Sequence, residues 1–348
     1  MSRPVVFAIP GDLQTRTGGY GYDRRMIEEL TALDCRVQHI PLPSGFPDPS
    51  KSEIAATTRL FAAIEGGSTV LVDGLAFGAL PDLAEAEAVR LDLIALVHHP
   101  LSLETGLTAD RVAKLKEDET HALRFARCVV VTSSETGRIL TRDFDVPRDR
   151  IAVVPPGTDR RPVRSRQEHI PLILAVGSLI PRKGYDILIE ALGTLQDLVW
   201  TCRIVGSADM DPSHAAELEA LVTQVGLAER VLFAGSVDGL AAEYDAADIF
   251  ALATRYEGYG MVFGEALAHG LPIVGTTGGA VSDVVPDSAG ILVEPADACM
   301  FADALRRMIS DSDLRSRYAE GARQAAQRLP SWRDSAIALK DVLRRSKQ

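Results

Sequence analysis

The feature that most constrains this sequence is the alternation of short apolar runs with longer amphipathic segments. Strands that are apolar at almost every position are buried on both faces, which is typical of parallel sheets covered by helices. The alternation therefore predicts an α/β protein. The runs are VVFAI (5–9), STVLV (68–72), LIALV (93–97), CVVVT (128–132), IAVV (151–154), LILAV (172–176), RIV (203–205), VLFA (231–234), IFALA (249–253), PIVG (272–275) and GILV (290–293).

The length of the chain indicates two domains. A chain of 348 residues is too long for one ordinary core and long enough for two. The periodicity holds in both halves but stops at residues 153–171, where prolines, arginines and other polar residues follow one another. We interpret this stretch as an interdomain linker. The sequence thus predicts two doubly wound domains, residues 1–156 and 157–330, that face each other across a cleft.

Composition excludes several classes of protein. A hydrophobic fraction of 46% with mixed charge indicates a soluble globular chain, and no apolar run approaches the roughly 20 residues that cross a bilayer. The first residues lack the features of a secretory signal, so we expect a cytoplasmic protein. A net charge of -11 argues against a nucleic-acid partner. Cys35, Cys128, Cys202 and Cys299 lie far apart, which suggests buried thiols and neither a zinc knuckle nor a disulfide framework.

Polar residues that follow the apolar runs are the first candidates for a site, because ligands of open α/β sheets bind beyond the carboxyl ends of the strands. Gly18 and Gly19 immediately precede an amphipathic helix, where backbone amides and the helix dipole favour an anion. His98 and His99 directly follow the run at 93–97. A histidine after a strand also often satisfies a backbone group. We favour a functional role for His98 and leave both interpretations open for His99.

The stretch RYEGYGMVFGEALAHGLPIVGTTGG (255–279) holds the clearest candidate site. It predicts a loop at 257–260, a helix at 261–269 and then a strand. Glu257 ahead of the helix can point outward at neutral donors, which leaves the amides of residues 260 to 263 free for a diphosphate. Glu265 can accept hydrogen bonds from vicinal hydroxyls. A ligand with hydroxyls, a diphosphate and further hydroxyls is a nucleotide sugar.

The stretch resembles the E-x7-E motif of retaining glycosyltransferases of family 4, which have the GT-B fold of two facing Rossmann-like domains. Further matches are the glycine pair Gly18-Gly19, His98, the serine-rich VTSSETGRIL at 131–140, the hinge at 155–159 and Lys183-Gly184 in the loop after the run at 172–176. The sequence PSWRDSAIALKDVL at 330–343 resembles the final helix that crosses back onto the first domain in this family. The resemblance therefore implies that residues 331–348 pack on the N-terminal domain.

The resemblance implies roles for individual residues. The donor binds mostly in the C-terminal domain, where Glu257 contacts sugar hydroxyls, Glu265 contacts the ribose, and the backbone near Gly235 and Ser236 contacts the base. His98 lies by the sugar and the acceptor, so His98 and Glu257 are the expected catalytic residues. The expected donor-binding residues are Gly18, Gly19, Arg182, Lys183, Gly235, Ser236, Gly258, Tyr259, Gly260, Met261, Val262, Phe263 and Glu265.

The implied reaction is retaining transfer of a sugar from a UDP or GDP sugar to a hydroxyl acceptor, which is a saccharide, a lipid-linked saccharide or a small molecule. In a front-face mechanism the donor phosphate takes the acceptor's proton, and cations and helix amides stabilise the leaving diphosphate. No metal ion or other cofactor is then needed. The D-x-D pairs at 143–145, 209–211 and 311–313 could bind a metal ion, but we interpret them as solvated turns away from the strand ends.

The sequence also departs from the family pattern. Ser178 follows Gly177 where the family often carries an arginine, so neutralisation of the diphosphate must rely on Lys183, Arg182 and backbone amides. The hinge lacks its usual asparagine. Asp283 stands where a glutamate is common, and a helix cap is an equal alternative to a role in the site. A dinucleotide fingerprint beginning at Gly258 is disfavoured because its third glycine is misplaced.

Three further alternatives concern partners and function. Arginines at 24, 25, 160, 161, 164 and 166 could form a basic face for a lipid-linked acceptor at the inner face of the membrane, in weak peripheral contact, although scattered solvated charge is favoured. A non-hydrolysing nucleotide-sugar epimerase would share the fold but needs acid and base groups around the sugar, and beyond the histidine pair we find none. A catalytically silent nucleotide-sugar sensor would have no need of Glu257 and His98, which are both present.

Overall fold

The computed structural model describes residues 4–161 and 170–345, and the protein is α/β throughout. Its contacts divide the chain into two compact units, which are Met1–Gly157 with Pro330–Gln348, and Thr158–Leu329. Each unit contains a six-stranded sheet, and all the strand pairs in both sheets are parallel. The part of the predicted linker at 162–169 lies outside the described residues. No helix within the described ranges has the length and apolar character needed to cross a bilayer.

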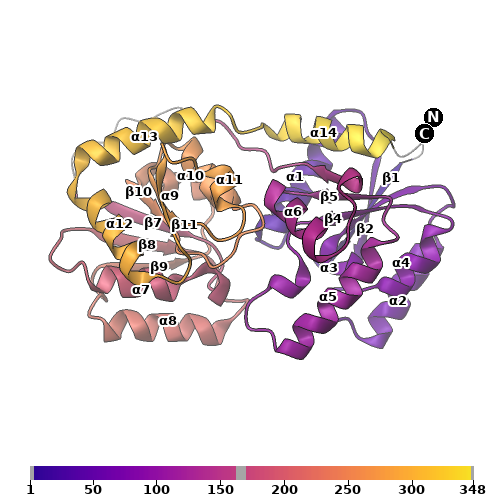
Figure 1. Cartoon of the computed structure of the whole chain (residues 1–348), viewed down its shortest axis with the longest axis horizontal. Coiled ribbons are helices and arrows are strands. Elements are labelled where there is room, and N and C mark those ends of the chain that lie inside the picture. The colour runs from indigo at the N-terminus through magenta and orange to yellow at the C-terminus, as the bar shows by residue number, and fades with distance from the viewer. Residues whose placement is uncertain (1–3, 162–169, 346–348) are drawn as a thin grey trace. The chain divides into compact units, whose positions relative to one another are not determined.

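The first unit alternates strands and helices, as the apolar runs predicted (Figure 1). Its strand order is β2-β1-β3-β4-β5-β6, so the order reverses between β1 and β3. Ligands of doubly wound sheets bind at this reversal. The elements are β1 (Val5–Pro10), α1 (Gly18–Ala32), β2 (Val37–Leu42), α2 (Lys51–Ala62), β3 (Thr69–Asp73), α3 (Gly74–Phe77), α4 (Pro81–Ala88), β4 (Asp92–Val97), η1 (Leu101–Leu103), α5 (Ala109–Leu123), β5 (Cys128–Val131), α6 (Ser134–Asp143), η2 (Arg148–Arg150), β6 (Ile151–Val153) and α14 (Trp332–Arg345).

Strand β2 is the element that the apolar runs did not predict. It is the edge strand of the first sheet, paired only with β1, and most of its residues are half-buried or exposed. Its sequence VQHIPL includes His39 and Pro41. An edge strand can contain proline because one side of its backbone has no strand partner, and it does not need a fully apolar sequence.

The second unit has the strand order β12-β11-β10-β7-β8-β9, the Rossmann order, with its reversal between β7 and β10. The loops that follow these two strands carry Lys183 and Glu257. The elements are β7 (Leu172–Val176), η3 (Pro181–Lys183), α7 (Tyr185–Gly193), β8 (Thr201–Val205), α8 (Pro212–Gln224), β9 (Val231–Gly235), α9 (Leu240–Ala246), β10 (Ile249–Ala251), α10 (Met261–Ala268), β11 (Ile273–Thr276), α11 (Val281–Val284), β12 (Gly290–Val293), α12 (Ala298–Ser310) and α13 (Ser312–Ala326).

Gly184 lets the loop after β7 lie directly against the end of β10. Its φ is +66°, and a Cβ atom there would stand 1.9 Å from the carbonyl oxygen of Ala253. Only glycine fits a left-handed conformation with such a close backbone approach. The neighbouring Lys183 is thereby brought to the segment that follows β10.

The final helix belongs to the first unit. Helix α14 packs on α1, and the yellow helix lies beside α1 in Figure 1. Trp332 is 7% exposed, with its ring centroid 6.1 Å from that of Tyr22. Lys340 donates to the carbonyl oxygen of Leu33 over 2.6 Å. These contacts make the last residues part of the first core, whereas the cleft expected between the domains stays a prediction.

Candidate functional site

Glu257 is a buried carboxylate held by cations from the loop after β7. Lys183 Nζ lies 2.7 Å from Glu257 Oε1, and Arg182 Nη1 lies 3.6 Å from Oε2. Thr254 also donates to Oε1, over 3.2 Å. Burial on its own would raise the pKa of Glu257, but the charges of Lys183 and Arg182 outweigh it and hold the pKa below its ordinary value. Glu257 is therefore a carboxylate at neutral pH.

The orientation expected for Glu257 is wrong. The sequence suggested a side chain that points outward at neutral donors, but only 6% of the residue is exposed and its oxygens face two cations and a hydroxyl. The reason is the strand order. Because β7 and β10 are neighbours, their loops meet, and a buried carboxylate there requires positive partners.

The backbone of Glu257 is fixed by the loop that follows β11. Glu257 and Gly279 form an isolated parallel bridge, in which Glu257 donates to Gly278 over 3.2 Å and accepts from Ala280 over 2.9 Å. Gly279 has a φ of +67°, and a Cβ atom there would lie 2.2 Å from the carbonyl oxygen of Glu257. The carboxylate is thus positioned by loops that follow three adjacent strands, β7, β10 and β11.

Glu265 lies on α10 and is half-buried. Tyr244 of α9 donates its hydroxyl to Glu265 Oε2 over 2.8 Å. Burial raises the pKa of Glu265, and the bond from Tyr244 opposes that shift only in part. The two glutamates therefore differ, because Glu257 is balanced by cations and Glu265 by a neutral donor.

The start of α10 has the expected conformation but fewer available amides than expected. Gly260 is the N-cap residue with a φ of +89°, and no side chain caps this end. The amide of Phe263 is not free, because it donates to the carbonyl oxygen of Gly260 over 2.9 Å. The Phe263 ring is fully buried, 5.3 Å from that of Phe250. The backbone at Gly260, Met261 and Val262 remains as the candidate anion site.

Residues flanking this helix start have distinct surroundings. Tyr259 is buried, and burial together with the charge of Asp283 raises its pKa to about 12. Gly258 lies in the loop between Glu257 and Tyr259. Asp283 lies in the first turn of α11, whose N-cap residue is Ala280, so the helix-cap interpretation of Asp283 is wrong.

Gly235 and Ser236 lie at the carboxyl end of β9 and are exposed. The carbonyl oxygen of Gly235 accepts from Gly206 over 2.9 Å, which ties it to the end of β8. This is the same edge of the sheet as the loops after β7 and β10, although β9 is the outermost strand. Contact of these two residues with a nucleotide base stays a prediction.

The D-x-D pairs serve local structure. Asp211 and Asp311 cap α8 and α13, and Asp143 pairs with Arg142 over 2.7 Å. Asp209 interacts with Ser207 in a turn. Among the described residues, the group with the spacing of a metal site is instead Asp23, Asp73 and His98, in the first unit.

His98 lies beside two buried carboxylates. Its Nε2 atom is 3.2 Å from Asp23 Oδ1 and 3.5 Å from Asp73 Oδ2. Asp73 ends β3, and its Oδ1 accepts from the amide of Leu75 over 2.8 Å. His98 follows β4, so β3, β4 and the helix after β1 bring the three side chains together at the reversal of strand order.

The glycine pair Gly18-Gly19 lies close to His98. Helix α1 begins at Gly18, and a Cβ atom on Gly19 would lie 3.5 Å from Cδ2 of His98. Anion binding by these glycines stays a prediction. His99 Nε2 lies 3.9 Å from Glu104 Oε2, and nothing in this arrangement assigns His99 a chemical role.

The arginines considered as a basic face differ in their local surroundings where the structure describes them. Arg24 donates to the carbonyl oxygens of Leu13 and Thr15, and Arg25 stacks over Trp332 with its guanidinium carbon 5.1 Å from the ring centroid. Arg160 and Arg161 are exposed in the other unit, and Arg164 and Arg166 lie outside the described residues.

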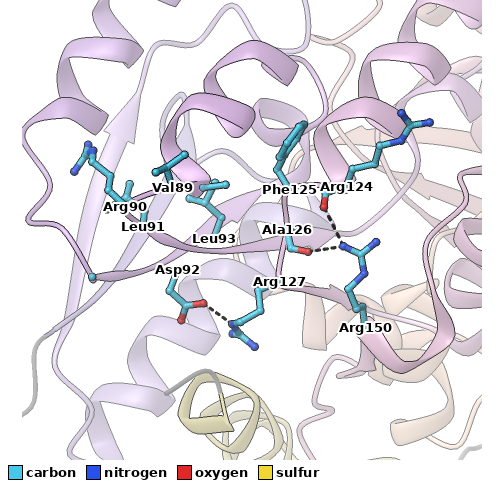
Figure 2. A pocket seen from close by; sticks show the side chains of 12 residues that line it. Val89, Arg90, Leu91, Asp92, Leu93, Arg124, Phe125, Ala126, Arg127 and Arg150 are labelled. Atoms are coloured by element: carbon cyan, nitrogen blue, oxygen red, sulfur yellow. Dashed lines mark hydrogen bonds and ion pairs between the residues drawn. The ribbon is translucent and has the colours of Figure 1, made fainter. Parts of the chain in front are cut away.

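A pocket in the first unit lies away from these strand ends. It is lined by residues 88–93 and 124–127 together with Gly67 and Arg150, at the amino ends of β4, β5 and β6 (Figure 2). Arg150 donates to the carbonyl oxygens of Arg124 and Ala126 over 3.0 and 3.1 Å, and Arg127 pairs with Asp92. Arg150 thus supports the backbone, and Arg127 pairs with a carboxylate. Because the pocket lies at the amino ends of strands in the first unit, it is not the predicted donor site.

Sequence reasoning missed Asp23, Asp73, Thr254 and Tyr244. Asp73 directly follows the apolar run at 68–72, so the strand-end rule that selected His98 could have found it. Asp23 lies four residues after Gly19, on the same face of α1. Tyr244 is 21 residues from Glu265 in sequence and gave no local signal.

Profiles of two known families match the chain. Residues 4–157 match the family described as "Glycosyl transferase 4-like domain", and residues 158–325 match "Glycosyl transferases group 1". The chain is 35% identical over 244 residues to a D-inositol 3-phosphate glycosyltransferase of Xylanimonas cellulosilytica, a match that spans 64% of this chain and 58% of that protein. It is 26% identical over 330 residues to an MMP alpha-(1->4)-mannosyltransferase of Mycolicibacterium hassiacum, spanning 90% of this chain and 79% of that protein.

Solved structures share the fold. Sucrose-phosphate synthase from Thermosynechococcus elongatus matches with a TM-score of 0.84 and 22% identity, covering 99% of both chains. Anabaena HepE, solved in complex with UDP-glucose, matches with a TM-score of 0.73 and 18% identity, covering 98% of both chains. The two family matches together cover both units. The chain therefore belongs to the group 1 glycosyltransferases of family 4 and has the GT-B fold.

Proposed function

We propose that the protein is a retaining glycosyltransferase that moves a sugar from a UDP or GDP sugar to a hydroxyl acceptor without a metal ion. The observation that carries this proposal is the pairing of Lys183 with Glu257, 2.7 Å apart, at the reversal of strand order in the second sheet. A cationic loop, a buried carboxylate and a helix start without a side-chain cap meet there. These are the groups that a sugar diphosphate requires.

The cations of this site suit a leaving diphosphate. The side chains of Lys183 and Arg182 are 13% and 17% exposed, against 7% for Glu257, so the cations are the more accessible partners. Negative charge accumulates on the diphosphate as the glycosyl–phosphate bond loosens. Lys183, Arg182 and the amides at the start of α10 then stabilise the transition state more than the ground state. Positive side chains thus do what a metal ion does in other transferases.

The two glutamates have separate roles in the proposal. Glu257, a carboxylate whose backbone is fixed by Gly279, accepts hydrogen bonds from the hydroxyls of the donor sugar. Glu265 accepts from the ribose hydroxyls and is oriented by Tyr244. His98 of the first unit is proposed to act at the sugar and the acceptor.

The relatives support a nucleotide-sugar donor more strongly than any one acceptor. HepE binds UDP-glucose in a structure of the same fold, whereas the relatives from Xylanimonas cellulosilytica and Mycolicibacterium hassiacum are named for different reactions. We therefore keep the acceptor as a hydroxyl on a saccharide, a lipid-linked saccharide or a small molecule. We also propose a cytoplasmic location, with weak contact at the inner face of the membrane if the acceptor is lipid-linked.

The experiment begins with a panel of nucleotide sugars screened for slow acceptor-free hydrolysis, which identifies the donor. Transfer to an acceptor is then followed by NMR, and we expect the product to keep the donor's α configuration and the rate to survive excess EDTA. His98→Ala should lower kcat roughly 10²-fold or more without changing UDP affinity in calorimetry. Glu257→Gln should lower kcat similarly while UDP binds at least as tightly, because Lys183 loses a charged partner.

Two further variants test the donor contacts. Glu265→Ala and Lys183→Ala should each weaken UDP or GDP binding by about 1–3 kcal/mol. Glu217→Ala on the exposed face of α8 is the control and should change nothing, because its side chain is 76% exposed. A β-linked product, or activity lost to EDTA and restored by Mg²⁺, contradicts the proposed mechanism. Turnover of the donor to an epimer without acceptor would instead identify an epimerase.

A further inference from the structure

One ring nitrogen of His98 faces two carboxylates at once. Nε2 lies 3.2 Å from Asp23 Oδ1 and 3.5 Å from Asp73 Oδ2, and the two aspartates are 0% and 3% exposed. A lone pair on Nε2 would point at two negative oxygens. If Nε2 carries a hydrogen, the N–H group donates a hydrogen bond to one carboxylate oxygen and is attracted by the other. The arrangement therefore fixes Nε2 as the protonated nitrogen of His98.

Residues of helix α1 pack against the His98 ring. Gly19, Tyr22 and Asp23 are three and four residues apart, so they share one face of the helix. The position of a Cβ on Gly19 is 3.5 Å from the His98 ring, and the Tyr22 ring meets the imidazole edge-on at 5.1 Å. Because these residues pack against the imidazole, its orientation is set by the protein before any ligand arrives.

The charge of the cluster favours a charged ring. When both aspartates are ionised, the cluster carries two buried negative charges if His98 is neutral, and imidazolium compensates one of them. In the described part of the chain, Asp23 Oδ2 has no hydrogen-bond partner, so His98 is the group that balances Asp23. Asp73 has an additional donor in the amide of Leu75.

We propose that Asp23 and Asp73 are positioning residues that hold His98 as an imidazolium with Nε2–H toward the protein and Nδ1–H presented to the ligand as a hydrogen-bond donor. The inference deepens the proposed transfer and rests on it for the identity of the ligand. An N–H group at Nδ1 can donate a hydrogen bond to an oxygen of the sugar or of the diphosphate. A neutral ring with hydrogen on Nε2 would instead offer a lone pair to the ligand.

The negative charges around His98 also favour its protonated form. Burial would lower the pKa of His98, but Asp23 and then Asp73 raise it above its ordinary value. Burial and the charge of Asp23 raise the pKa of Asp73 to about 7, although His98 opposes the shift. Among the described residues, the other titratable groups coupled to these aspartates are Tyr20 and Tyr22 of α1 and His39 of β2. The Tyr20 hydroxyl donates to the carbonyl oxygen of Pro10.

The test measures His98 directly in the ligand-free protein, so it does not depend on transferase activity. Nitrogen NMR of protein labelled in histidine reports which ring nitrogens carry hydrogen, and His98→Gln assigns the signal. We expect hydrogen on both nitrogens at pH 6, and on Nε2 alone after the ring titrates. Asp23→Asn and Asp73→Asn should each move this titration down by about one pH unit or more. Asp82→Asn, an exposed position of α4, is the control.

The same variants give a second measurement in the transfer reaction. Because Nδ1 loses its hydrogen when the ring deprotonates, it can no longer donate a hydrogen bond to the ligand, and the transfer rate should fall as pH rises. In the aspartate variants this fall should begin at lower pH, with the effect on kcat larger than on KM. If the proposed reaction fails but the NMR titration shifts as expected, the positioning stands and only the ligand is wrong.

Three results would overturn the inference. A wild-type His98 that carries hydrogen on Nδ1 and none on Nε2 contradicts it even if no aspartate variant folds. Folded Asp23→Asn and Asp73→Asn proteins with an unmoved His98 titration also contradict it. A stoichiometric divalent metal ion in the purified protein that is lost on Asp23→Asn would show a metal site in its place, since the ligand atoms lie within 4.8 Å of one another.

Discussion

At the residue scale, buried and half-buried carboxylates in this protein are stabilised in different ways. Glu257 has two cations, Glu265 has a tyrosine hydroxyl, and Glu119 of α5 has one backbone amide. Glu119 is 1% exposed and accepts from Leu101 over 2.9 Å, in the turn that follows His98-His99-Pro100. One neutral donor does not offset its burial, which raises the pKa of Glu119 to about 8.

This pKa predicts how stability depends on pH. Between about pH 4.3 and the folded pKa, the unfolded state releases the proton while the native state keeps it, so this group makes unfolding easier as pH rises. Glu119→Gln removes that dependence. Its stability relative to wild type should therefore increase by roughly 2–4 kcal/mol from pH 5 to pH 8.

Urea unfolding of the first unit, followed by Trp332 fluorescence in a Trp200→Phe background, measures this difference. Glu117→Gln on the same helix is the control, because its side chain is 78% exposed. If wild type and Glu119→Gln change in parallel between the two pH values, Glu119 is ionised in the native state and the prediction is wrong.

At the element scale, the site depends on how loops after neighbouring strands meet. The segment after β10 is held by the loop after β7 through Lys183 and by the loop after β11 through Gly279. Lys183 is the last residue of the short 3-10 helix η3, whereas Gly279 lies outside the named helices and strands. A side chain on Gly279 would force the two loops apart, because both the conformation and the space exclude it.

Gly279→Ala should therefore destabilise the second unit and move Glu257. We expect a loss of about 3 kcal/mol or more in urea unfolding, together with a fall in kcat. Gly239→Ala is a matched control, since its φ is +89° but nothing lies within 4 Å of an added Cβ. It should cost only about 1–2 kcal/mol for the left-handed conformation. Equal losses for the two variants would mean that the close approach to Glu257 is not important.

At the scale of the whole molecule, the chain forms two cores, and its last helix is part of the first. Trp332 begins α14 and packs against Tyr22 and Arg25 of α1. The position of a Cβ on Gly157 is 2.2 Å from the Trp332 backbone, so the end of the first unit and the start of the last helix are in close contact. Removal of the Trp332 ring is therefore expected to lower the stability of the first unit and not that of the second.

Trp332→Ala should destabilise the first unit by about 3–5 kcal/mol, the usual cost of truncating a buried aromatic side chain. The second unit should be unaffected. Trp200, which is 1% exposed in that unit, then reports its unfolding by fluorescence, and calorimetry with UDP checks its site. Calorimetric unfolding of the variant should show the first unit melting earlier. An equal drop in both transitions would show that the units unfold as one.

The fold class and the two-sheet organisation could be predicted from the sequence because they rest on local patterns. Buried parallel strands are apolar along their whole length, and each of the predicted runs contains or overlaps a strand of the structure. Strand β2 was missed for the same reason, since an exposed edge strand with Pro41 lacks that pattern. The motif spacing identified Glu257, Glu265 and Lys183 as candidates.

The sequence by itself determined which residues stand at strand ends, because that depends only on the chain next to them. Only the tertiary structure decided which of these ends meet. Lys183 and Glu257 are 74 residues apart, and His98 and Asp23 are 75 apart. Their contacts follow from strand order, which is fixed by crossover connections and by packing of helices on both faces of each sheet. Hydrophobic periodicity shows which faces of one element are buried, but it does not show which other elements of the chain are its neighbours.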